Sequence, residues 1–122
     1  MLPSLVLLST VAACRNTQNP STPTPPPGQG PTITIAAAGV SPKNIDVTIG
    51  MRVLFVNSDS VSHHVGSDPH PDHTDCPDIN QVGFLLPGQS RETGNLVQPR
   101  VCGFHDHDRP TVQALRGTIT IR

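Results

Sequence analysis

The sequence has very few aromatic residues, which limits how its core can be built. Its 122 residues include no Trp, no Tyr, three Phe and two Met. Val, Ile, Leu and Ala must therefore supply most of the buried surface. A short chain also buries a smaller fraction of its surface than a long one does. The sequence has room for one small folded domain and no second one.

Charged residues are also scarce, and neither sign predominates. They make up 14% of the chain, with 8 Lys and Arg against 9 Asp and Glu, for a formal net charge of −1. Binding to nucleic acid requires a concentrated basic surface. We therefore expect no nucleic-acid partner.

Motifs for nucleophilic catalysis are absent from the sequence. It contains no Gly-x-Ser-x-Gly segment and no phosphate-binding loop, and few hydroxyl residues lie near a His–Asp pair. A domain of this size also leaves little room for a substrate pocket. We expect a protein that is not an enzyme.

The N-terminus carries the features of an export signal. Residues 1–13 form an apolar stretch followed by small residues, too short to span a bilayer, and are interpreted as a signal peptide. The stretch lacks the usual basic residues, so the signal is weak or the true start lies upstream. Residues 11–14 (VAAC) resemble the lipobox of bacterial lipoproteins, which implies that Cys14 is lipidated. The alternative is an ordinary signal peptide that leaves Cys14 as a free thiol.

Residues 14–31 are polar and rich in proline. Such a segment can neither bury apolar surface nor continue a helix or strand, so it is predicted to be an extended tether. Together with a lipidated Cys14, it would hold an exported, periplasmic or cell-surface domain close to a membrane.

The remaining residues, 32–122, have the pattern of an all-β domain. Short β-branched runs with a period of two occupy 32–38, 44–49, 52–57 and 117–122, and turn residues separate them. This spacing is typical of a sandwich or barrel, and we expect a β-sandwich. Residues 66–81 and 105–114 are predicted to be long loops.

Histidine is the one residue type with a biased distribution. All six histidines lie between His63 and His107, on or beside the predicted loops. Loops on a rigid β scaffold are where binding sites are usually built. The cluster is therefore the main indication of function.

Three segments resemble the cupredoxin family. Residues 41–65 (SPKNIDVTIGMRVLFVNSDSVSHHV) are similar to its first half, and LLPGQS at 85–90 to its Pro-Gly turn. FHDHDRP, followed by LRGTITIR, resembles the loop that carries copper ligands and the final strand. The resemblance covers most of 32–122. It implies a Greek-key β-sandwich of about seven to eight strands, the blue copper domain, that binds one copper ion.

The resemblance also implies a first copper ligand. In the family an imidazole ligand stands six residues after the Asn that ends a strand, and His63 stands six residues after Asn57. His64 would then point to the opposite side of the extended chain.

Two alignments of the C-terminal ligand loop remain open. In one, Cys102 and His105 form the Cys-x-x-His pair of a blue copper site, with Cys102 as the thiolate ligand. In the other, which we prefer, Asp106 takes the usual Cys position and His107 is the ligand. The predicted metal ligands are His63, His105, Asp106 and His107, with Cys102 as an alternative.

The preferred alignment frees Cys102 for a disulfide with Cys76. Export to an oxidising compartment favours this pairing. Ligation of copper by Cys102 and two unpaired thiols are the alternatives. His70 and His73 could form a second metal site or complete the main one, although Pro69 and Pro71 favour an extended chain that would separate them. Their other interpretation is a solvated acidic loop whose histidines titrate near neutral pH.

By resemblance, the expected function is electron transfer at the membrane surface, to or from a redox partner protein. One alternative is copper binding or delivery through a His-rich site without a thiolate, with a copper donor or acceptor as partner. Another is a structural module that binds no metal. We expect a monomer.

Overall fold

The computed structural model describes residues 29–122. The predicted signal peptide, Cys14 and most of the predicted tether therefore lie outside the described residues. The first strand begins at Gln29, three residues before the expected start of the folded domain, because Gln29 already pairs with Arg52. Among residues 29–122, no helix is long and apolar enough to cross a membrane.

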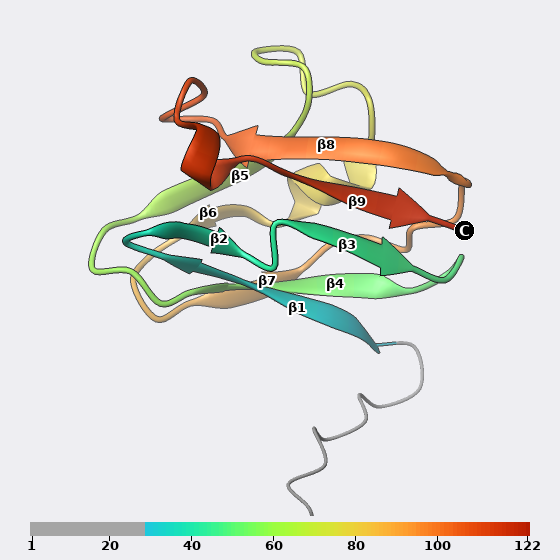
Figure 1. Cartoon of the computed structure of the whole chain (residues 1–122), viewed down its shortest axis with the longest axis horizontal. Coiled ribbons are helices and arrows are strands. Elements are labelled where there is room, and N and C mark those ends of the chain that lie inside the picture. The colour runs from blue at the N-terminus through green and yellow to red at the C-terminus, as the bar shows by residue number, and fades with distance from the viewer. Residues whose placement is uncertain (1–28) are drawn as a thin grey trace, which may run out of the picture.

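Two sheets pack face to face (Figure 1). The first has the order β2-β1-β4-β7, with bounds Gly39–Ser41, Gln29–Ala36, Arg52–Asn57 and Ser90–Glu92. The second has the order β3-β9-β8-β5-β6, with bounds Asn44–Val47, Gly117–Ile121, Arg100–Asp106, His63–Ser67 and Gly83–Leu85. Two 3₁₀ turns, η1 (Pro77–Gln81) and η2 (Gln113–Leu115), lie in the connections. The expected β-sandwich is confirmed, with nine strands in the described part of the chain.

Alternating apolar residues build the core between the sheets. In β4, Val53, Phe55 and Asn57 are buried, while the residues between them are more exposed. Phe55 meets Phe104 of β8 edge to face, with ring centroids 5.2 Å apart. Two of the three Phe residues thus join the two sheets. Aliphatic side chains fill most of the remaining core, as the composition predicts.

Residues 105–114 are not the continuous loop that the sequence predicts. β8 extends through Asp106 because its last two residues still pair with β5, His105 with Gly66 and Asp106 with Val65. His63 and His64 likewise lie in β5. These histidines therefore belong to the sheet, whereas His70 and His73 lie in the connection between β5 and η1.

The predicted disulfide between Cys76 and Cys102 is confirmed. Their Cα atoms are 5.9 Å apart, and both residues are buried. The bridge fastens the segment after β5 to the middle of β8. A bridged Cys102 offers no thiolate, so the structure provides no cysteine ligand at this position.

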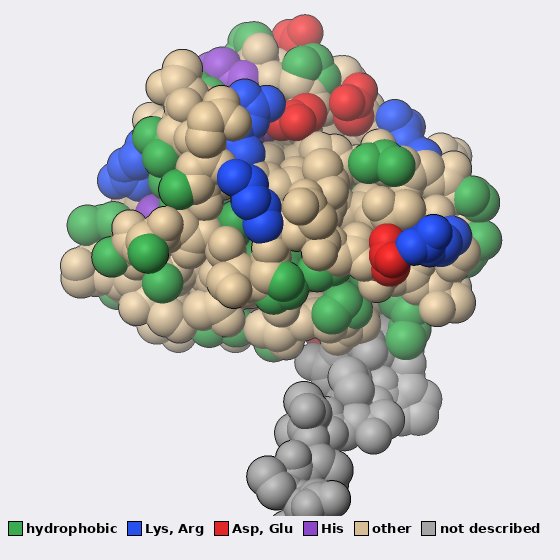
Figure 2. All heavy atoms as spheres, in the orientation of Figure 1, with side chains coloured by type: hydrophobic (Ala, Val, Ile, Leu, Met, Phe, Trp, Pro, Cys, Tyr) green, Lys and Arg blue, Asp and Glu red, His purple; other side chains and the backbone are tan. Residues whose placement is uncertain are grey.

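The molecular surface mixes both signs of charge. On the face shown in Figure 2, Lys and Arg side chains lie among Asp, Glu and apolar ones, and histidine is visible only toward the left of the view. No continuous basic patch covers this face of residues 29–122.

Candidate metal centre

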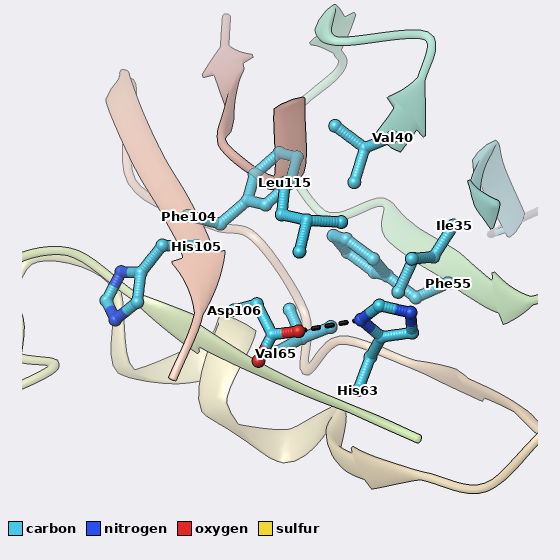
Figure 3. A pocket seen from close by; sticks show the side chains of 9 residues that line it. All are labelled: Ile35, Val40, Phe55, His63, Val65, Phe104, His105, Asp106 and Leu115. Carbon is cyan, nitrogen blue, oxygen red and sulfur yellow. Dashed lines mark hydrogen bonds and ion pairs between the residues drawn. The ribbon is translucent and has the colours of Figure 1, made fainter. Parts of the chain in front are cut away.

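β8 sends alternate side chains to opposite sides of its sheet. Phe104 and Asp106 point into the sandwich, while His105 points to the other side, away from Asp106 (Figure 3). His107 follows the same alternation as His105. The strand thus divides the predicted ligands between an inner and an outer face.

Four histidines meet on the outer face. His105 and His107 come from β8 and the residue after it, and His70 and His73 come from the segment that follows β5. One ring nitrogen of each lies within 4.8 Å of those of the other three. We call these four residues the outer cluster. His105 is buried, His73 and His107 are half-buried, and His70 is exposed.

A turn brings His70 and His73 to the sheet. The amide of His73 donates to the carbonyl of Pro69 at 2.7 Å, and the amide of Asp75 donates to that of Asp68 at 2.9 Å. His73 takes a left-handed backbone conformation with φ of 55°. The extended segment expected around Pro69 is therefore wrong, because these hydrogen bonds close the chain into a turn.

Two glycines make room for this turn. A Cβ atom on Gly66 of β5 would collide with the imidazole of His73, and one on Gly103 of β8 would collide with the carboxylate of Asp68. Because neither strand position carries a side chain, the turn lies directly on the backbone of the sheet.

His105 has the hydrogen bonding of a metal ligand. Its Nδ1 atom lies 2.7 Å from Oδ1 of Asp68, so the carboxylate fixes the ring and accepts its proton. Its Nε2 atom is buried and has no hydrogen-bond partner among the described residues. Metal-bound histidines usually donate their other N–H to a carboxylate in this way. The residues present therefore fit a metal ion bound at Nε2 of His105.

His73 is held in the form that can bind metal. Burial lowers its pKa below the ordinary value of 6.5, and repulsion from His105 and His107 lowers it further. Its Nε2 atom lies 2.8 Å from Nδ1 of His107. Neutral imidazole is the form that coordinates metals. A fifth ring, that of His64, lies beside the cluster, with its centroid 5.0 Å from that of His107.

His63 and Asp106 form a separate contact on the inner face. Nδ1 of His63 lies 2.6 Å from Oδ2 of Asp106 (Figure 3), and its Nε2 lies 2.9 Å from Oδ2 of Asp59. Arg109 adds a guanidinium nitrogen 3.2 Å from the same oxygen of Asp106. We call these four residues the inner cluster.

Both carboxylates of the inner cluster are held ionised. Burial alone would raise the pKa of Asp106, but hydrogen bonds from His63 and from two backbone amides outweigh it and bring that pKa below its ordinary value of 3.8. The hydrogen bond from His63 is the main reason that the pKa of Asp59 is also lowered.

The structure thus places the predicted ligands in two groups. His63 and Asp106 contact each other inside the sandwich, and His105 and His107 lie outside it with His70 and His73. Four residues that were not among the predicted ligands also take part: Asp59 and Arg109 belong to the inner cluster, and Gly66 and Asp68 contact the outer one. The sequence could have indicated that Asp106 lies apart from His105 and His107, because neighbouring residues of a strand face opposite sides of the sheet.

The chain resembles solved cupredoxin structures over most of its described length. A purple cupredoxin from Nitrosopumilus maritimus shares 21% identity over 76% of this chain and 100% of its own, with a TM-score of 0.59. Oxidised plastocyanin from Dryopteris crassirhizoma shares 16% over 75% of this chain and 99% of its own, with a TM-score of 0.58. An oxidised amicyanin variant shares 15% over 75% of this chain and 80% of its own, with a TM-score of 0.60. The sequence matches no protein-family model and no curated protein.

Proposed function

Because the chain has the cupredoxin fold, we propose that it binds one copper ion through the outer cluster and holds or delivers it without a thiolate ligand. The observation that carries this proposal is the buried Nε2 atom of His105, which has no partner among the described residues and belongs to a ring that meets three other histidines. Leaving such an atom without a partner costs roughly 1 to 3 kcal/mol, and a metal ion would remove that cost.

The donor set favours copper among the common metals. Imidazole nitrogen suits copper, zinc and nickel, and copper(II) binds most tightly of the divalent first-row metals. Metal-bound nitrogens lie about 2 Å from the ion, so opposite ligands are roughly 4 Å apart. The nitrogens of the outer cluster, all within 4.8 Å of one another, need only small side-chain rotations to reach that spacing.

The disulfide supports an extracytoplasmic site of action. Bridges such as Cys76–Cys102 persist in oxidising compartments. We therefore include export, and the lipid anchor expected at Cys14, in the proposal. The partner would be a protein that donates copper to, or accepts it from, the exposed side of the cluster at His70.

Electron transfer at the membrane surface is the second candidate function. The exposed ring of His70 would give a partner access to the copper site. However, both cysteines of the described chain are bridged, so the copper–thiolate bond of blue copper sites has no source there. Copper holding or delivery is therefore the better supported of the two, and neither function requires the chain to be an enzyme.

A copper titration of the oxidised protein tests the proposal. We expect one retained Cu(II) ion, a weak visible band, and nitrogen hyperfine splitting in the paramagnetic resonance spectrum. His73→Asn should weaken binding, whereas Asp72→Asn, an exposed change in the same segment, should not. Failure to retain copper, or an intense thiolate-to-copper band, would contradict the proposal.

Voltammetry separates the two candidate functions. A reversible one-electron wave with fast electrode exchange would favour electron transfer. Slow, irreversible reduction together with stoichiometric loss of copper to a chelator would favour delivery.

A further inference from the structure

We infer that the guanidinium of Arg109 closes the inner cluster to metal, so that no copper ion binds between His63 and Asp106 in this chain. The resemblance to cupredoxins implies copper ligands at His63 and His107, with Asp106 in the usual Cys position. The structure fills the space facing His63 and Asp106 with the side chain of Arg109.

The position of Arg109 carries the inference. Its Nη1 atom lies 3.2 Å from Oδ2 of Asp106 and 3.5 Å from Nδ1 of His63. These are the two atoms through which His63 and Asp106 contact each other. Both side chains would have to direct these atoms toward an ion that they bound together. The same Nη1 also donates to the carbonyl of Ser62 at 3.2 Å. The guanidinium therefore faces both donors that such an ion would need.

The turn after β8 sets this position. The amide of Arg109 donates to the carbonyl of Asp106 at 3.1 Å, and the amide of Asp108 donates to its carboxylate at 2.9 Å. The turn directs the side chain of residue 109 back to that of residue 106. Asp106 and Arg109 are three residues apart, as Cys and His are in a Cys-x-x-His motif, with Asp in place of Cys and Arg in place of His.

Every nitrogen and oxygen atom with which His63 and Asp106 could bind a metal is already hydrogen-bonded. His63 uses one nitrogen on Asp106 and the other on Asp59. Asp106 accepts from His63 and Arg109 at Oδ2, and from two backbone amides at Oδ1. A metal ion would have to break these bonds. The outer cluster differs, because Nε2 of His105 has no partner to lose.

Charge also opposes a metal ion at this position. A guanidinium stays protonated at every relevant pH, so it already neutralises part of the negative charge of Asp59 and Asp106. A divalent cation a few ångströms from it would be repelled by this charge and would find the two carboxylates already partly neutralised.

Solvent access does not explain the closure. A cavity of about 200 Å³ is bordered by Asp59, His63 and Arg109. Ions from solution can therefore approach the inner cluster, and what closes it is Arg109 together with its hydrogen bonds.

The test uses the full chain with the outer cluster disabled by His70→Asn and His73→Asn. This double variant should retain no Cu(II) after gel filtration against a weak chelator. Adding Arg109→His should restore one retained Cu(II) ion per chain, because an imidazole then joins His63 and Asp106. Adding Arg109→Lys, which keeps the positive charge, should restore none.

A further change, His63→Gln, should abolish the ion gained with Arg109→His. If Arg109→His does not fold, as judged by circular dichroism, Arg109→Ala with added free imidazole should gain the ion instead. The inference fails if folded Arg109→His, or folded Arg109→Ala with free imidazole, gains no copper. It also fails if the double variant already retains an ion that His63→Gln removes.

The result is independent of the proposed function. If the unmodified chain retains no copper but the Arg109→His variant gains one ion, the proposed function is wrong and the inference stands. If the unmodified chain retains one ion but Arg109→His, added to the His70→Asn, His73→Asn variant, gains none, the proposed function stands and the inference is wrong.

Discussion

The imidazole of His73 lies against Gly66, in the space where any other residue would place its Cβ atom. Gly66→Ala should therefore push His73 out of the outer cluster. We expect copper affinity to fall at least about tenfold, as for the loss of a supporting contact in other metal sites. Isothermal titration with Cu(II) measures the change.

The control for this substitution is Gly88→Ala: a Cβ atom at Gly88 meets no neighbouring atom, and its cost comes only from the positive φ of 82° in a turn that does not contact the outer cluster. Copper affinity should be unchanged in that variant. Equal loss of affinity in both variants would contradict the role assigned to Gly66.

Asp68→Asn should weaken copper binding without unfolding the protein. The carboxylate of Asp68 accepts the Nδ1 proton of His105 and so leaves Nε2 as the nitrogen that can bind a metal. Substituting such a partner typically lowers metal affinity by about 10 to 100-fold. Competition with a coloured chelator measures the effect, with Asp72→Asn as the matched acidic control. Affinity unchanged in Asp68→Asn would show that His105 needs no carboxylate partner.

Replacing both bridged cysteines should cost stability and copper affinity together. Cys76 and Cys102 are 26 residues apart, and closing a loop of that length constrains the unfolded chain by about 3.5 kcal/mol. We expect the Cys76→Ser, Cys102→Ser variant to lose about that amount in urea unfolding. Its copper affinity should also fall, because Cys76 fastens the segment that carries His73. If only stability changed, the bridge would have no part in forming the site.

The stability of the metal-free protein should fall as the pH drops below 6.5. Burial holds the pKa of folded His73 below that ordinary value, so the unfolded chain binds more protons between the two pKa values. Stability therefore rises with pH in this window and is lost as the pH falls through it. Urea unfolding at several pH values should show this slope, and His73→Asn should reduce it. A slope unaffected by the substitution would assign the effect to another group.

Asp106→Asn should destabilise the fold but leave copper binding intact. The substitution removes the carboxylate shared by buried His63 and by Arg109, and breaking a buried ion pair costs about 3 to 5 kcal/mol. We expect the low end, because Arg109 is 40% exposed.

The pH dependence of this variant gives a second measurement. The lowered pKa of Asp106 contributes stability above pH 3.8, which is lost as the pH falls through the folded value. Acid unfolding should therefore be shallower in Asp106→Asn. A matching loss of copper affinity at neutral pH would contradict the separation of the two clusters.

Much of the fold could be predicted from the sequence. Residues 44–57 show the alternation of half-buried strands, and the match to cupredoxin segments set the architecture. The disulfide followed from the export signal and from two otherwise unassigned cysteines. The extent of β8 could not be predicted, because its last residues are polar and only their pairing with β5 keeps them in the strand.

The site was predicted in part. His105 and His107 were expected as ligands and lie in the outer cluster. Placing them at one site with His63 rested only on the residue spacing of the cupredoxin family. The convergence of His70 with them depends on a turn held by backbone hydrogen bonds and on two glycines across the sheet, which no local pattern reveals. The position of Arg109 depends likewise on the turn that follows β8.

The alternation of side chains along β8 has a consequence for how this protein tolerates mutation. Scanning 104–107 one residue at a time should give an effect that oscillates with a period of two. Changes at Phe104 and Asp106 should alter resistance to unfolding whether or not copper is present, since these side chains face the interior. Changes at His105 and His107 should act mainly on the additional stability that copper confers. One strand would then carry two independently variable sets of residues, and a new metal preference could arise on one side without disturbing the packing on the other.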